Sequence, residues 1–185
     1  MWISRLLEGQ RAYQFSMERH RVGGAKLVTH AFMRSTPDQH DPDWPRYPET
    51  VLTFATSPQL EIDLRQPLSE SALTGLKRIG LADPFAVLTA YDPRGADLPR
   101  EENERRRRQL NDRLKRSGYK FLEVDACSPD RSHCEQSVAV VMPQREAIAL
   151  ATQLEQVAIF WFDGERFWIL GAYVDSDPLM LPRSS

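Results

Sequence analysis

The chain lacks a long hydrophobic run, a signal-peptide pattern and an excess of charge of either sign. Its 185 residues include 24 Lys and Arg against 26 Asp and Glu, which gives a formal net charge of -2. This balance provides no overall attraction to nucleic acid, and no segment approaches the ~20 apolar residues that span a bilayer. Residues 1–7 are followed at once by Glu8 and Arg11, without a small-residue cleavage site. We therefore expect a cytoplasmic protein without a membrane segment.

Cysteine is also scarce, and phosphate-binding glycine motifs are missing. The two cysteines, Cys127 and Cys134, are expected to be free thiols, because nothing else in the sequence indicates an oxidising compartment. With His133 they would supply only three metal ligands, and no further CxxC or HxxxH group completes a tetrahedral set. GxGxxG and GxxxxGK[ST] are both absent. The sequence thus predicts no metal and no cofactor.

What is present is the pattern of a globular domain. Strands are predicted at 51–54, 60–64, 85–91, 120–125, 137–141, 158–162 and 167–173, and helices at 70–79, 99–117 and 143–157. Ser69 and Gly80 mark the ends of the first helix, and Asp163-Gly164 predicts a hairpin turn. These elements indicate an α/β or α+β fold, with a single mixed β-sheet covered by about three helices. An N-terminal helix (2–22) and arm precede it.

Three regions follow from this pattern. Residues 1–50 are expected to form an N-terminal helix and a Pro-rich arm, residues 51–175 a single α/β domain, and residues 176–185 a C-terminal tail. Within the last hairpin, Phe162 and Phe167 should share one face, and Trp161 and Trp168 the other.

The most informative stretch is a strand, loop and helix unit at 85–118. Its loop, 92–95, follows a strand and leads to the amino end of a helix, a place where free backbone N–H groups favour anions. Asp97 is a candidate capping residue and Gly118 a candidate C′ residue. On the helix, Asn103 shares a direction with Leu110 and Leu114 to within about 20°. We therefore expect Asn103 to be buried and to bond the 89–95 segment.

Arg106 and Arg107 flank the direction of Asn103 by about 60° and 40°. They either reach solvent or bind a carboxylate or phosphate. Although they belong to the run of four arginines at 105–108, a helix spreads four consecutive residues around its circumference. The run therefore forms no single patch, and nucleic-acid binding is not predicted.

An ordered set of short motifs carries a family resemblance. The motifs are Leu88-Thr89-Ala90-Tyr91-Asp92-Pro93-Arg94-Gly95, Glu102-Asn103, Gly118-Tyr119, Ser128-Pro129-Asp130, Glu135-Gln136-Ser137 and Gln156-Val157-Ala158-Ile159-Phe160. Over about residues 85–172 the chain resembles the bacterial family catalogued as domain of unknown function 3293. In that family the residue matching Asp92 is usually Asn, and the residue matching Gln136 is often Pro. The resemblance implies a small bacterial cytoplasmic domain, and it implies no activity.

The polar residues of these motifs sit at element ends, where they could converge on one pocket. We expect the domain to bind a small anionic ligand, such as a nucleotide or a phosphorylated metabolite. The candidate ligand-binding residues are Tyr91, Asp92, Arg94, Gly95, Asn103, Arg106, Arg107, Glu135 and Ser137.

Three alternatives remain open. Glu135 could pair with Arg106 or Arg107 and only join helix to sheet. A hydrolase or transferase could use Glu135 or Asp92 as general base. An interaction protein could act through the N-terminal arm and the aromatic C-terminal hairpin, with a protein partner or a second copy of the chain as a homodimer.

Overall fold

The computed structural model describes residues 40–183 of the chain. The predicted N-terminal helix and most of the predicted arm lie outside these residues. In chain order, with η for a short 3-10 helix, the elements are η1 (Trp44–Glu49), β1 (Val51–Phe54), β2 (Leu60–Asp63), α2 (Glu70–Arg78), β3 (Phe85–Thr89), η2 (Pro93–Gly95), α3 (Arg100–Arg116), β4 (Phe121–Cys127), β5 (Cys134–Val140), α4 (Gln144–Gln153), β6 (Ala158–Phe162), β7 (Phe167–Gly171) and β8 (Leu179–Met180).

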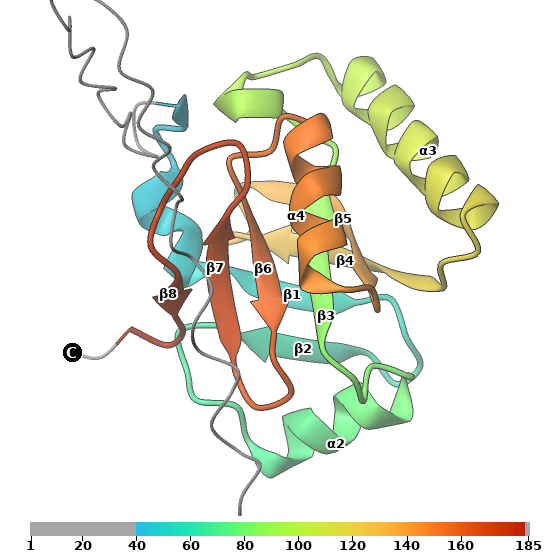
Figure 1. Cartoon of the computed structure of the whole chain (residues 1–185). Coiled ribbons are helices and arrows are strands. Elements are labelled where there is room, and N and C mark those ends of the chain that lie inside the picture. The colour runs from blue at the N-terminus through green and yellow to red at the C-terminus, as the bar shows by residue number, and fades with distance from the viewer. Residues whose placement is uncertain (1–39, 184–185) are drawn as a thin grey trace, which may run out of the picture. The chain divides into compact units, whose positions relative to one another are not determined.

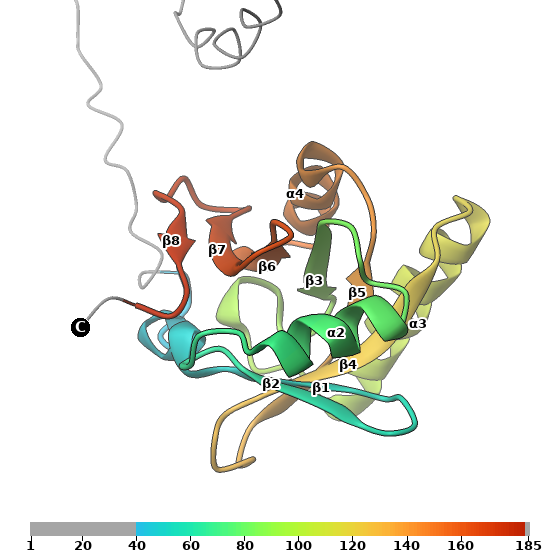
Figure 2. The same ribbon diagram turned by 90° about the horizontal axis from the view of Figure 1, so that it is seen from below.

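The described strands form one curled sheet of eight strands in the order β2-β1-β4-β5-β3-β6-β7-β8 (Figures 1 and 2). All neighbouring pairs are antiparallel. The prediction of a single sheet is confirmed, but the prediction that it mixes parallel and antiparallel pairs is wrong. β3 and β4, joined by α3, do run in the same direction, as in a parallel unit. They do not pair, because β5 lies between them and is antiparallel to both.

Helix ends follow the local signals in the sequence, with one exception. The Ser69 side chain accepts a hydrogen bond from the Ala72 N–H at the start of α2, and Gly80, with φ of 89°, ends that helix. Gly118, with φ of 76°, follows α3 as predicted. Asp97 does not cap α3. The cap residue is Pro99, and the Asp92 carboxylate instead accepts from the Leu98 N–H, one residue earlier.

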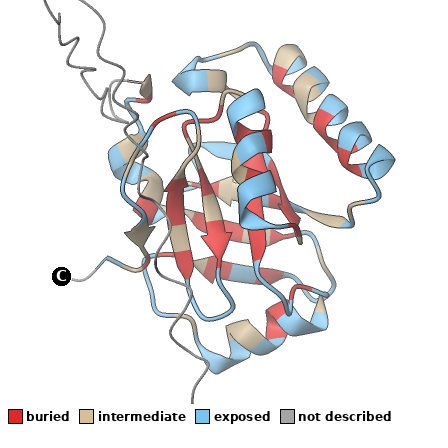
Figure 3. Ribbon diagram, in the orientation of Figure 1, coloured by how far each residue is buried: buried red, intermediate tan, exposed pale blue. Residues whose placement is uncertain are grey.

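The core has two parts on opposite faces of the sheet, because alternate residues of the strands belong to one part or the other. We call the face that α2 and η1 cover the inner face, and the face that α3 and α4 cover the outer face. Buried residues are concentrated in the strands (Figure 3). Leu76 of α2 and Tyr47 of η1 pack with the inner-face strand residues. α3 and α4 cover the outer face with Leu110, Leu114, Ala147, Leu150 and Ala151. No helix within residues 40–183 is long and apolar enough to cross a membrane.

The aromatic hairpin of β6 and β7 divides its side chains as predicted. Phe162 and Phe167 lie in the inner-face core, with ring centroids 5.2 Å apart. Trp161 and Trp168 are cross-strand partners and belong to the outer-face cluster. Part of the expected C-terminal tail also joins the sheet, since Leu179–Met180 forms β8 and pairs with β7.

Candidate functional site

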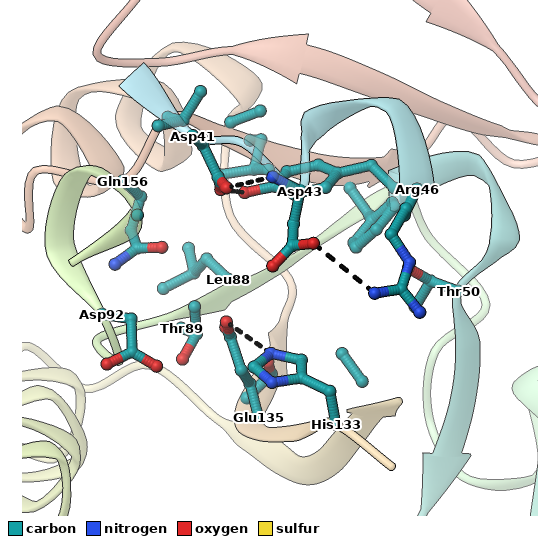
Figure 4. Close-up of a pocket in the computed structure, with 18 of the residues that line it drawn as sticks. Asp41, Asp43, Arg46, Thr50, Leu88, Thr89, Asp92, His133, Glu135 and Gln156 are labelled. Carbon is teal, nitrogen blue, oxygen red and sulfur yellow. Dashed lines mark hydrogen bonds and ion pairs between the residues drawn. The ribbon is translucent and has the colours of Figure 1, made fainter. Parts of the chain in front are cut away.

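A cavity of about 420 Å³ lies where the end of β3 meets four other parts of the chain. Its lining residues fall within 41–50, 87–89, 92–97, 126–137 and 156–160. Val87, Ala158 and Phe160 supply apolar surface. Polar side chains such as those of Asp92, Glu135 and Gln156 surround it (Figure 4). Volumes of roughly 300–1,000 Å³ with mixed linings are typical of small-molecule sites.

The 92–98 loop forms one wall, and a closed set of hydrogen bonds holds it. Asp92 has φ of 40°, a left-handed conformation that Asp tolerates better than most residues. Asn103 Oδ1 accepts from the Asp92 N–H at 3.0 Å, and Asn103 Nδ2 donates to Asp92 Oδ1 at 2.8 Å. Asn103 is only 6% exposed. The predicted burial and bonding of Asn103 are confirmed, and its role is to shape the cavity wall rather than to line it.

Gly95 allows the same loop to approach the chain near residue 41. A Cβ atom at this position, where φ is 68°, would lie 2.9 Å from both the Asp41 Cα and the His40 carbonyl oxygen. Both distances are shorter than side chains tolerate, and the positive φ adds strain for any other residue. Gly95 is therefore required for the cavity to close on this side.

The two inward arginines do not reach the cavity. Arg106 Nε donates to the Ala90 carbonyl at 2.7 Å, and its Nη2 donates to the Leu154 carbonyl at 2.8 Å. Arg107 forms ion pairs with Glu104 and Glu123. Both side chains are thus occupied within the protein, and neither lines the cavity.

Tyr91 and Arg94 also point elsewhere. The Tyr91 hydroxyl donates to Glu104 Oε1 at 2.7 Å, and burial together with this contact raises the pKa of Tyr91 to about 12. Arg94 pairs with Glu155 at 2.8 Å and lies over the ring of Tyr173. Of the nine candidate residues, Asp92, Gly95, Glu135 and Ser137 line the cavity.

Glu135 and Ser137 share the cavity-facing side of β5. The alternative in which Glu135 pairs with Arg106 or Arg107 is wrong, since Oε1 of Glu135 contacts Nε2 of His133 at 3.4 Å. The hydrogen bond to Glu135 raises the pKa of His133, and partial burial opposes the shift. Ser137 is 5% exposed, and its hydroxyl makes no hydrogen bond within residues 40–183.

The sequence interpretation missed the wall next to η1. Asp41 accepts from the Asp43 N–H at 2.8 Å and from the Tyr47 hydroxyl at 2.5 Å. Burial, followed by the charge of Asp41, raises the pKa of Tyr47, so the hydroxyl stays protonated as a donor. The Tyr47 ring packs against Trp44 and Phe160. Trp44 and Tyr47 are two aromatic residues in a Pro-rich segment, and they were the sequence signal that this segment packs on the domain.

Gln156 is another lining residue that was not among the nine candidates. It follows α4, is 6% exposed, and donates from Nε2 to the Tyr91 carbonyl at 2.6 Å. Because only the amide nitrogen can donate to that carbonyl, the bond fixes the side chain with Oε1 directed toward the cavity (Figure 4). Oε1 itself accepts no hydrogen bond in the part of the chain that the structure describes.

The two cysteines at the cavity wall are joined, so the prediction of free thiols was wrong. Cys127 and Cys134 form a disulfide. They face each other as cross-strand partners in the β4–β5 hairpin, a register that sequence spacing alone does not specify. Disulfides are typical of oxidising compartments, and the cytoplasmic location therefore stays a prediction. Residues 40–183 contain no group of three or more His, Cys, Asp or Glu that could hold a metal ion.

Comparison with known proteins bears on the same region. Residues 88–159 match the model of a family described as Protein of unknown function (DUF3293). This confirms, for that segment, the resemblance carried by the motifs. The segment runs from β3 to β6 and contains Asp92, Glu135, Ser137 and Gln156, so it holds much of the cavity wall. No curated protein and no solved structure matches the chain.

Proposed function

We propose that this domain of unknown function binds a small organic ligand in the cavity beside the 92–98 loop. The cavity itself supports the proposal: about 420 Å³ of space combines an apolar floor with polar groups from five separate segments. Several of those groups are held in place by contacts outside the cavity, as Asn103 holds Asp92. Such preorganisation lowers the entropic cost of binding.

The charges favour a ligand rich in hydrogen-bond donors over the anionic ligand expected from the sequence. Five carboxylates line the cavity, those of Asp41, Asp43, Asp92, Asp97 and Glu135. Arg46 is the only arginine or lysine in the lining, and it pairs with Asp43 at 3.5 Å. An anion here would face uncompensated negative charge.

The test is a fragment screen by ligand-observed NMR with a matched pair of variants. Ala158→Phe places a phenyl group at the cavity, whereas Ala149→Phe places the same group on the exposed side of α4. Both variants must retain the circular dichroism spectrum of the parent protein. We expect bound fragments to lose affinity in Ala158→Phe and to keep it in Ala149→Phe. Absence of any binder, or equal affinity in the two variants, would refute the proposal.

The contact between His133 and Glu135 favours hydrolysis as a second candidate function. A carboxylate that orients an imidazole beside a cavity is a common arrangement for a general base. Activity would be measured on a panel of simple esters, amides and phosphoesters. A turnover that is lost in His133→Gln would support this function, and a full panel without turnover would count against it.

The alternative of an interaction protein gains less support from the described residues. Trp161 is 8% exposed, and Trp168 Nε1 donates to Asp163 Oδ2 at 2.6 Å. Both aromatic rings pack on the outer face of the sheet. The hairpin therefore presents little free aromatic surface for a partner.

A further inference from the structure

One end of the cavity gathers acceptors that have no donors. Gln156 is 6% exposed, yet its Oε1 accepts no hydrogen bond from residues 40–183 and is directed into the cavity (Figure 4). The oxygen itself is reached from the cavity, so a donor on a ligand can supply the hydrogen bond that residues 40–183 do not. Gln156 thus points to a ligand independently of the carboxylates around it.

Asp92 supplies a second acceptor, and it carries a charge. Its Oδ1 already accepts from the Leu98 N–H at 2.9 Å and from Asn103 Nδ2 at 2.8 Å. Its Oδ2 accepts from no described residue, while the loop holds the carboxylate in place at the cavity wall. Asp92 and Gln156 lie at the same end of the cavity in Figure 4.

We propose that this end of the cavity recognises the primary ammonium group of an amine whose body is apolar. The inference rests on the ligand-binding function proposed above and adds the chemical class. A primary ammonium has three N–H donors and no acceptor, so it can satisfy Asp92 Oδ2 and Gln156 Oε1 together. Its bond to the Asp92 carboxylate is charge-assisted.

The rest of the lining fits the same class. The excess of carboxylates favours a cation and disfavours an anion. Val87, Ala158 and Phe160, which belong to the same side of the sheet as Tyr47, line the adjoining space and offer apolar contact to the body of the amine. A polyamine charged along its whole length would leave this apolar surface without a matching partner, and we therefore assign a single terminal ammonium.

The experiment compares ligands that differ at one end only. Isothermal titration calorimetry measures 2-phenylethylamine, 2-phenylethanol and phenylacetate, and then the pentyl series 1-pentylamine, 1-pentanol and pentanoate, at fixed pH and salt. In each series we expect the amine to bind about tenfold or more tightly than the alcohol, as a single charge-assisted hydrogen bond provides. The carboxylate is expected to bind most weakly.

Asp92→Asn is the diagnostic variant, because Asn keeps Oδ1 for the Leu98 and Asn103 bonds and tolerates the left-handed backbone. Only the free charged oxygen is lost. We expect about a tenfold loss of amine affinity and little change for the alcohol. Asp112→Asn, on the exposed side of α3, removes the same charge away from the cavity and should change neither.

The outcomes separate the two proposals. If fragments bind the cavity but amines show no advantage over alcohols, or Asp92→Asn and Asp112→Asn weaken amine binding alike, the ammonium assignment is overturned and the binding function stands. If no fragment of any class binds the cavity, the binding function fails, and the ammonium assignment fails with it.

Discussion

Replacing Asn103 with Ala would remove the side chain that joins α3 to the cavity wall. The substitution deletes a bond to the backbone N–H of Asp92 at 3.0 Å and a bond to the Asp92 carboxylate at 2.8 Å. A net value of about 1 kcal/mol for the first and about 1.5–3 kcal/mol for the second gives a loss of roughly 2.5–4 kcal/mol. The Asp92 N–H would also lose its partner in a site where Asn103 is only 6% exposed.

Asn111 provides the matched control, because it lies two turns further along α3 and is 8% exposed. Its Oδ1 is buried without a partner, and its one hydrogen bond, to Glu123, is long at 3.4 Å. Asn111→Ala should therefore change the free energy of unfolding by less than about 1 kcal/mol. Urea unfolding of both variants measures the contrast, provided that the m-values agree. Equal losses in the two variants would show that burial, and not the hydrogen bonds to Asp92, sets the contribution of Asn103 to the free energy of unfolding.

Three further predictions concern the surroundings of the cavity. Arg106→Ala should lower the free energy of unfolding by about 3 kcal/mol, the lower end for two charge-assisted bonds because the side chain is only half-buried, whereas Arg108→Ala should cost less than about 0.5 kcal/mol in the same urea assay. The contact with Glu135 raises the pKa of His133 above 6.5. The stability that this contact adds to the fold is therefore present below pH 6.5 and is lost as the pH rises through the raised pKa. His133→Gln should then cost up to about 0.5 kcal/mol at pH 5.5 and less at pH 8.5, and an equal cost at both would contradict the assignment. Cys134→Ser opens a loop whose ends are 7 residues apart and should cost about 2.5 kcal/mol in the chain-entropy model, while the denatured, unreduced parent should show no reactive thiol.

Local signals explain how much of the fold could be predicted. Local capping and backbone chemistry sets the helix ends. Ser69 marks the start of α2, and Gly80 and Gly118 mark the ends of α2 and α3, each where the sequence predicts it. The burial of Asn103 followed from its direction on the helix. The division of the aromatic hairpin followed from strand alternation about the Asp163-Gly164 turn.

What could not be predicted depends on contacts between distant parts of the chain. The insertion of β5 between β3 and β4 is a choice of strand order, and local pattern carries no information on it. The partners of Arg106 are carbonyl groups 16 and 48 residues away, which no helical wheel can identify. The same applies to the Cys127–Cys134 pairing, which needs the exact register of the hairpin. Asp41 and Gln156 meet at the site only through folding, because they lie far apart in the sequence.

The most direct test of ligand binding in this cavity is a two-dimensional NMR titration of the ¹⁵N-labelled protein with 2-phenylethylamine. We expect the side-chain amide of Gln156 and the backbone amides of residues 92–97 and 133–137 to shift together with one dissociation constant. The amides of α2, whose residues do not line the cavity, should stay in place. Shifts centred on α2, or no saturable shift at Gln156 and the 92–97 loop, would contradict the account.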